Sequence, residues 1–133
     1  MRSTSFPFTE RQAAALGTVQ RPMADVLLRD KDGNPITVAM LVDSGADVSV
    51  LSPQIARILG LKIKGGERRI FRGIGGTMVA YLHQIPITIG DLTMTLPVAI
   101  PLREVTNLLG RMGILDTCSI HLLREKVVTF EYD

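Results

Sequence analysis

The fold of this chain is decided by the stretch Val38-Ala39-Met40-Leu41-Val42-Asp43-Ser44-Gly45-Ala46-Asp47-Val48-Ser49-Val50-Leu51-Ser52. Its first five residues are apolar, and so short an apolar run predicts a buried strand. The strand runs into Asp43, and Gly45 allows the backbone to turn sharply just afterwards. The stretch therefore predicts a carboxylate presented at the end of a buried strand. An ordinary Asp-Ser-Gly turn is the alternative, because such a triplet arises by chance in roughly one chain of this length in twenty.

The composition indicates one small domain. The chain has 133 residues, 46% of them hydrophobic, which suffices for one core, although small domains often gain from pairing. The only cysteine, Cys118, cannot form an intramolecular disulfide, and we expect it to be buried as a small apolar residue. We see no signal peptide and no run of ~20 apolar residues that could span a membrane, so the expected location is cytoplasmic.

Charge and histidine spacing exclude two classes of partner. The net charge is +2, and only two tyrosines and four phenylalanines are available for base stacking, so we expect no nucleic-acid partner. His83 and His121 lack the spacing to a cysteine or a second histidine that zinc sites show. We therefore expect no metal and no cofactor.

Turn residues on both sides of the central stretch predict further elements. An Asp-Gly turn separates apolar runs at 23–28 and 36–42, which predicts a hairpin leading into Asp43. Ser52 and Pro53 predict the N-cap and first position of a short helix that ends at Gly60. The inward face of that helix is expected to carry Ile55, Ala56, Ile58 and Leu59.

The rest of the domain is predicted to consist mainly of short strands. Three hairpins are expected: 69–71 with 78–81 around a glycine-rich tip, 85–89 with 92–96, and 119–123 with 127–132; a second short helix is expected at 112–115. Residues 1–20 show no clear hydrophobic period, and we interpret them as an N-terminal arm or propeptide-like segment that could include a helical turn at 13–16. The domain itself is expected to span residues 21–133. The prediction is a mostly β, barrel-like domain with one or two short helices.

Three features in this order resemble the retropepsin family, the retroviral and retroviral-like aspartic proteases. They are the apolar run into Asp43-Ser44-Gly45-Ala46-Asp47, the glycine-rich hairpin at 73–76, and Leu108-Leu109-Gly110-Arg111 near the end. The match covers about residues 21–132. It implies a closed, mostly β barrel that works as a homodimer on polypeptide substrates. Met112-Gly113 departs from the family, which usually has a polar helix-starting residue there, so the local helix is expected to begin late.

The single Asp-Ser-Gly of the chain supports the dimer independently. Aspartic-protease chemistry needs two carboxylates that share one proton, because two charges so close cannot both ionise. One carboxylate acts as base on a water while the other, protonated, donates to the scissile carbonyl. A two-fold axis would supply Asp43 from a second copy of the chain, and the couple would titrate as a unit.

The resemblance gives roles to six residues around this carboxylate. Asp43 would be catalytic, with Ser44, Gly45, Ala46, Asp47 and Arg111 in support. Ser44 would hydrogen-bond across the two-fold axis, Gly45 would leave room for substrate, and Arg111 would form a bidentate contact with Asp47 beneath the cleft and near the dimer interface. The alternatives are a solvent-facing serine and an exposed arginine without a fixed partner.

The resemblance also implies a flap and apolar pockets. Ile74, Gly75 and Gly76 would form the flap tip that closes over the peptide. A phosphate-binding loop is discounted, because no helix and no Gly-Lys-Ser/Thr follows. Val50, Thr106 and Leu108, with Ile74, are candidates for substrate pockets, although each residue type is also common in a core. Phe6-Pro7 resembles the junctions that retroviral proteases cut, which suggests self-processing as a hypothesis.

Two other functions compete with a homodimeric aspartic endopeptidase. A catalytically silent, dimeric peptide-binding or adaptor module would keep the fold, although it has no chemical reason to retain Asp43-Ser44-Gly45. A monomeric β-barrel with a fortuitous motif would not dimerise at micromolar concentration.

Overall fold

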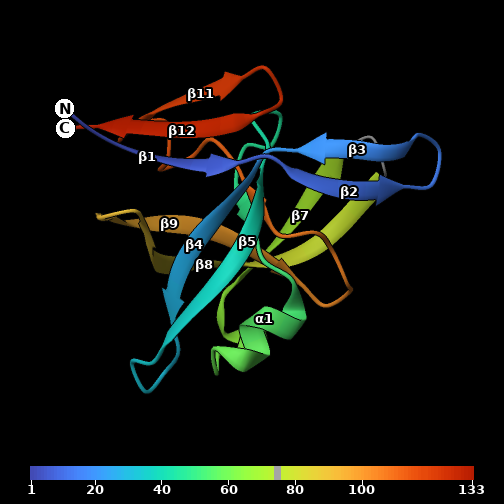
Figure 1. The fold of residues 1–133 in the computed structure, drawn as a ribbon. Helices are drawn as coiled ribbons and strands as arrows, with labels where there is room; N and C mark the ends of the chain where they lie inside the picture. The colour runs from blue at the N-terminus through green and yellow to red at the C-terminus, as the bar shows by residue number, and fades with distance from the viewer. Residues whose placement is uncertain (74–75) are drawn as a thin grey trace.

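The computed structural model describes residues 1–73 and 76–133 (Figure 1). Its strands are β1 (Arg2–Pro7), β2 (Thr9–Ala13), β3 (Gly17–Arg21), β4 (Met23–Arg29), β5 (Pro35–Val42), β6 (Ser49–Val50), β7 (Glu67–Gly73), β8 (Gly76–Ile89), β9 (Leu92–Pro101), β10 (Leu108–Leu109), β11 (Ser119–Leu123) and β12 (Val127–Tyr132). Its helices are α1 (Pro53–Ile58) and one 3-10 turn, η1 (Ile63–Gly65). Among the described residues, neither helix has the length and apolar character that crossing a bilayer requires.

Strands β4, β5, β10, β6, β9 and β8 follow one another in a single sheet that closes on itself. The closure comes from a second pairing of β8, which meets β4 at Thr88 and Leu27. Strand β7 pairs only with β8 among the described strands, and the two extend from the barrel as a hairpin (Figure 1). The predicted mostly β barrel is confirmed.

The predicted hairpins are present, and turn residues explain their registers. Between β4 and β5 the Asp30 carboxylate accepts the backbone N–H groups of Asp32 and Asn34 at 2.9 and 2.8 Å, and Gly33 takes a φ of +85°. Between β8 and β9 the turn uses Gly90 with a φ of +62°. Such φ values favour glycine, so these turns could be located from the sequence.

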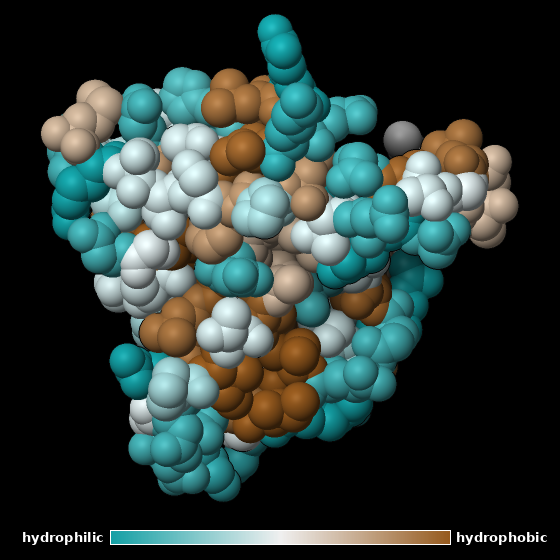
Figure 2. All heavy atoms as spheres, viewed as in Figure 1, coloured by the Kyte–Doolittle hydropathy of each residue, from teal (hydrophilic) through white to brown (hydrophobic). Residues whose placement is uncertain are grey.

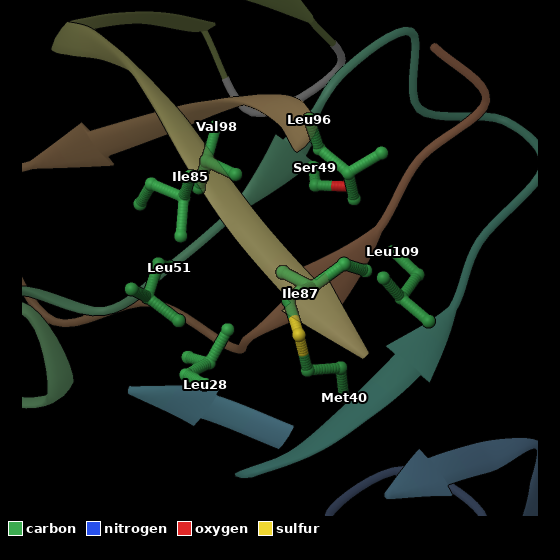
Figure 3. A pocket seen from close by; sticks show the side chains of 9 residues that line it. All are labelled: Leu28, Met40, Ser49, Leu51, Ile85, Ile87, Leu96, Val98 and Leu109. Atoms are coloured by element: carbon green, nitrogen blue, oxygen red, sulfur yellow. The ribbon is translucent and has the colours of Figure 1, made fainter. Parts of the chain in front are cut away.

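The barrel interior is filled by side chains. Alternate residues of β4, β5 and β8 are buried, as expected for strands with one face on a core. Figure 3 shows nine side chains, from these three strands and from β6, β9, β10 and the residue after β6, converging on a cavity of about 10 Å³, which is no larger than one water. All of them are apolar except Ser49. The barrel centre is therefore core and offers no room for a ligand.

Helix α1 begins and ends close to where the sequence predicts. The Ser52 side chain accepts the N–H of Ile55, Pro53 occupies the first position, and Gly60 follows the helix with a φ of +78°. Ala56 and Leu59 are buried and Ile55 is half-buried. Ile58, expected on the inward face, is 60% exposed instead, because a helix of six residues turns only one narrow side to the barrel.

The first twenty residues form strands where we expected an arm with a helical turn. Strand β1 pairs with β12 over six residues, and Phe6 packs edge-on against Phe130 with ring centroids 6.0 Å apart. Strands β2 and β3 form a two-stranded hairpin of their own, and residues 14–16 lie in its turn. Because β1 exposes most of its residues, its partner β12, not its own hydrophobicity, accounts for its position.

The pairing of β1 bears on the self-processing hypothesis. The Phe6–Pro7 bond lies within the register of β1 on β12. A protease site binds its substrate as an extended, unpaired strand. Cleavage at this bond therefore requires β1 to leave β12 first.

The expected helix at 112–115 is a series of turns. Backbone N–H groups of Ile114 and Leu115 both donate to the carbonyl of Arg111, and that of Cys118 donates to Ile114. Gly113 has a φ of +83°, which lies outside the helical range, so the turns do not extend into an α-helix. Cys118 is buried, as expected.

Three side chains tie the terminal strands to the β8–β9 turn. The Tyr132 hydroxyl donates to the Asp91 carboxylate at 2.5 Å, and Arg2 contacts Asp91 at 3.3 Å while its guanidinium lies 5.0 Å from the centroid of the Tyr132 ring. The hydrogen bond from Tyr132, helped by the positive charge of Arg2, lowers the pKa of Asp91. The same hydrogen bond raises the pKa of Tyr132.

We expect stability to decline on both the acid and the alkaline side through this contact. The contribution of Asp91, whose folded pKa lies below its ordinary 3.8, is complete above that value and is lost as the pH falls. The contribution of Tyr132, whose folded pKa lies above 10.0, is complete below that value and is lost as the pH rises through the folded pKa. In a plot of the unfolding temperature against pH, the decline at acid pH should be less steep for Asp91→Asn than for wild type. It should be unchanged for Asp25→Asn, which alters an exposed carboxylate on β4. Identical acid limbs for wild type and Asp91→Asn would contradict the expectation.

Candidate active site

Asp43 lies where β5 ends, and its backbone is fixed by a strand from the far end of the chain. Strand β10 lies between β5 and β6, parallel to the first and antiparallel to the second. The N–H of Asp43 donates to the carbonyl of Leu109 at 2.9 Å, which continues the β5–β10 ladder by one residue. The acidic residue is therefore anchored by the barrel although it lies just outside the strand.

The turn after β5 holds the carboxylate in one orientation. The N–H of Gly45 donates to Oδ1 of Asp43 at 2.9 Å, and the N–H of Ala46 donates to the Asp43 carbonyl at 3.2 Å. A Cβ on residue 45 would lie 3.2 Å from that same Oδ1, so glycine keeps this side of the carboxylate clear. Asp43 is half-buried and Ser44 and Gly45 are exposed. The second oxygen, Oδ2, is thus left for other partners.

The segment after β10 packs directly against the turn. The N–H of Gly110 donates to the buried hydroxyl of Ser49 at 3.0 Å, and the N–H of Arg111 donates to the Ala46 carbonyl at 3.0 Å. A Cβ on residue 110 would lie 2.4 Å from the Val48 carbonyl group. The two segments can approach this closely only because residue 110 is glycine.

Arg111 contacts Asp47, as the sequence predicts, but the contact is not bidentate. One guanidinium nitrogen, Nη2, binds an oxygen of the Asp47 carboxylate, and the other, Nη1, donates to the Ser44 carbonyl at 2.6 Å. Arg111 therefore connects both ends of the turn that follows Asp43. The side chains of Arg111 and Asp47 remain 44% and 78% exposed, so the pair lies at the surface of this copy.

The other predicted residues are distributed around this turn. Val50 and Leu108 face each other in the β6–β10 pairing and are half-buried, and Thr106 is exposed on the loop before β10. Gly76 begins β8 opposite Gly73, whereas Ile74 and Gly75 lie outside the described residues.

Several residues near the turn were not predicted from the sequence. Ser49 is fully buried and accepts the Gly110 N–H, and its place in an alternating apolar stretch was the available signal. Thr106 lines a hollow of about 280 Å³ together with Arg11 and Gln12, which we expected in an N-terminal arm, and with Arg21, Met23 and Leu41 of the expected domain. No side-chain cluster suited to a metal ion occurs among the described residues.

A second hollow of about 210 Å³ lies on another side of the turn. Its apolar lining comes from the ends of β5 and β10, from β11 and from Leu115, and the hollow also includes Ser44 and Arg111. The exposed Leu115 and Leu122 border it. An apolar surface therefore continues from the acidic turn to β11.

Three comparisons with known proteins show what this chain resembles. A family model described as aspartyl protease matches residues 24–122. A comparison with curated protein sequences gave no significant match. A retropepsin-like aspartic protease from Rickettsia conorii superposes with a TM-score of 0.66 at 13% identity, over 98% of this chain and 93% of that one. An EIAV protease in complex with an inhibitor gives a TM-score of 0.53 at 23% identity, over 68% of this chain and 82% of that one. At these identities the two structures establish a common fold.

Proposed function

The chain belongs to the aspartyl protease family, and we propose that it is an aspartic endopeptidase active as a homodimer, with Asp43 of each copy as the catalytic residue. The observation that carries the proposal is the Asp43 carboxylate, presented by the β5–β10 ladder with one oxygen held by the Gly45 N–H. Because the N–H of Asp43 donates to Leu109, 66 residues further along the chain, the position of this carboxylate is set by the barrel as well as by its own turn.

The proposed reaction is general acid–base hydrolysis. One Asp43 carboxylate takes a proton from a water, and the oxygen of that water forms a bond to the scissile carbonyl carbon. The protonated Asp43 of the second copy donates to the carbonyl oxygen, which gives a neutral gem-diol. The first Asp43 then gives the proton it took from water to the amide nitrogen, and the second Asp43 takes a proton from one gem-diol hydroxyl as the C–N bond breaks, which releases an amine and a carboxylic acid. Neither carboxylate is consumed, and the couple again shares one proton at the end of the cycle.

The apolar surface beside the turn supports the proposed dimer. Leu115, Leu122 and Leu123 are 47%, 54% and 52% exposed, and the first two border the hollow that reaches Ser44. Figure 2 shows hydrophobic atoms over the end of β11 at the top of the view. Within the described strands, β11 pairs on one side only, with β12. A second copy docked here would cover these leucines and bring its own Asp43 turn towards the first.

The remaining predicted roles belong to this proposal. In the dimer, Ser44 would bond across the two-fold axis, Arg111 with Asp47 would support the cleft floor, and Val50 and Leu108 would contact the peptide. The β7–β8 hairpin, which extends from the barrel, would close over the bound peptide and exclude water. The flap tip expected at Ile74 and Gly75 lies outside the described residues.

A peptide-library assay tests the proposed activity. We expect cleavage next to apolar residues, inhibition by a statine-containing peptide, and a specific activity that rises with protein concentration. Cleavage that resists the statine inhibitor would indicate another active site. Binding of library peptides without cleavage would favour the peptide-binding module.

Charge introduced on β11 should separate the copies. We expect Leu122→Glu combined with Leu123→Glu to raise the dimer dissociation constant by about 100-fold, because buried interface leucines would be replaced by unpaired carboxylates. Sedimentation velocity measures the change. Ile58→Glu is the matched control, because Ile58 is equally exposed but lies on α1, and it should leave the dimer intact. A double variant that sediments like the wild type would contradict this interface.

A further inference from the structure

The hollow that contains Thr106 lies between the β2–β3 hairpin and the barrel. It measures about 280 Å³ and is lined by Arg11, Gln12, Arg21, Met23, Leu41 and Thr106. The first two residues belong to β2, and Arg21 ends β3. The hairpin therefore forms one wall of the hollow, and β4, β5 and the loop before β10 form the other.

The strand register places this hollow next to the acidic turn. Leu41 precedes Asp43 by two residues on β5 and pairs with Leu108 of β10. Thr106 precedes Leu108 by two residues, and the carbonyl between them, on Asn107, accepts the N–H of Leu41 at 2.8 Å. A peptide bound across Asp43 in an extended form spans about 3.3 Å per residue, so a neighbouring side chain can reach the hollow.

The walls of the hollow carry positive charge without a negative counterpart. Two arginines and no acidic residue line it. Arg11 uses Nη1 to donate to the Glu10 carbonyl at 3.2 Å, a backbone contact that leaves the charge uncompensated. Neither Arg11 nor Arg21 takes part in any of the four ion pairs found within the described residues. In the β2–β3 register Thr9 opposes Arg21, so residues 9, 11 and 21 share one face of the hairpin.

We propose that this hollow is a cationic subsite in which Arg11 and Arg21 bind an acidic side chain of the peptide substrate. The inference rests on the proposed function and adds to it a preference for peptide substrates with an acidic residue near the cleaved bond. The fork of donors on each guanidinium suits a carboxylate, and the apolar Met23 and Leu41 would contact the methylene groups of a glutamate. Residues 9–21 lie outside the span that the aspartyl protease family model matches, residues 24–122, so the family match does not account for this subsite.

The test uses matched peptides that differ only in Glu or Gln at single positions flanking a cleavage site. We expect the Glu peptide to exceed the Gln peptide by about tenfold in kcat/KM at one position, as charge-assisted hydrogen bonds predict. The ratio should fall to about one in Arg11→Gln combined with Arg21→Gln. Arg29→Gln is the control, because this exposed arginine lies at the other end of β4, beside the Asp30 turn, and should retain the preference.

A binding measurement tests the proposed subsite independently of the proposed hydrolysis. Anisotropy titration of the same labelled peptides onto Asp43→Asn protein should reproduce the tenfold Glu preference and its loss in the double arginine variant. If wild type cleaves no peptide while this binding preference persists, the subsite stands and the proposed hydrolysis fails. If cleavage occurs with equal Glu and Gln rates at every position, the subsite is overturned. A double arginine variant that sediments as monomer while wild type is dimeric would also overturn it, because the arginines would then serve the contact between copies.

Discussion

Asp43→Asn is expected to remove peptide hydrolysis, with kcat/KM reduced by about 10³-fold or more. Asparagine has nearly the shape of aspartate but can neither accept the proton of the attacking water nor hold the proton shared between two copies. Its Oδ1 can still accept the Gly45 N–H that Asp43 accepts at 2.9 Å, so the turn should persist. Initial rates on the best library peptide, compared with wild type at equal dimer concentration, measure the effect.

Two controls isolate the chemistry from the fold. Asp32→Asn makes the same change in an exposed turn at the other end of β5, and it should leave the rate unchanged. Thermal unfolding of Asp43→Asn should match wild type within a few degrees. Activity that survives in a folded Asp43→Asn protein would place the active site elsewhere.

Gly110→Ala is expected to destabilise the fold by about 3 kcal/mol or more. The new methyl group would lie 2.4 Å from both the carbonyl carbon and the carbonyl oxygen of Val48 and 2.9 Å from the Ala46 oxygen. All three are backbone atoms, which cannot rotate aside as a flexible side chain does. The overlap can be relieved only if β10 moves away from residues 46–48. That movement would break the hydrogen bond from Gly110 to Ser49 and the one from Arg111 to Ala46.

Denaturant unfolding measures this cost, and a second glycine supplies the comparison. A Cβ on Gly65 would meet only the Lys62 Cβ at 3.6 Å, an ordinary contact. Gly65→Ala should therefore change the free energy of unfolding by less than about 1 kcal/mol. Equal stabilities for Gly110→Ala and wild type would refute the packing described around Asp43.

The parts of the fold that the sequence predicts are those with a strong local signal. The Asp30–Asn34 turn, the Gly90 turn and the Ser52–Pro53 helix start each depend on chemistry within a few residues. The order Asp43, glycine-rich hairpin, Leu108–Arg111 predicts the family, because three separated features must all agree. The Arg111–Asp47 contact was predictable only through that resemblance, since 64 residues separate the two side chains.

The parts that were missed depend on distant partners. Strand β1 carries little hydrophobic signal and is held by β12, more than a hundred residues away. The alanines at 13–15 favour a helix by propensity, yet the β2–β3 pairing places two of them in a turn. At 112–115 the apolar pattern suggested a helix, but Gly113 adopts a positive φ against the Leu96 side chain.

Side-chain roles near Asp43 were predictable to different degrees. Asp43, Gly45 and Arg111 follow from motif positions. Arg11 and Arg21 could not be connected to Thr106 from the sequence, because the connection exists only after the hairpin folds back beside β5. A substrate preference of this kind therefore requires the three-dimensional arrangement.

The pairing of β1 with β12 also means that the two chain ends lie together, as Figure 1 shows. A short linker from Asp133 to Met1 would turn these strands into an ordinary hairpin, and new ends could be opened in the exposed turn at Arg124 and Glu125. Such a circular permutant would preserve every strand pairing while its termini moved to the other end of β12.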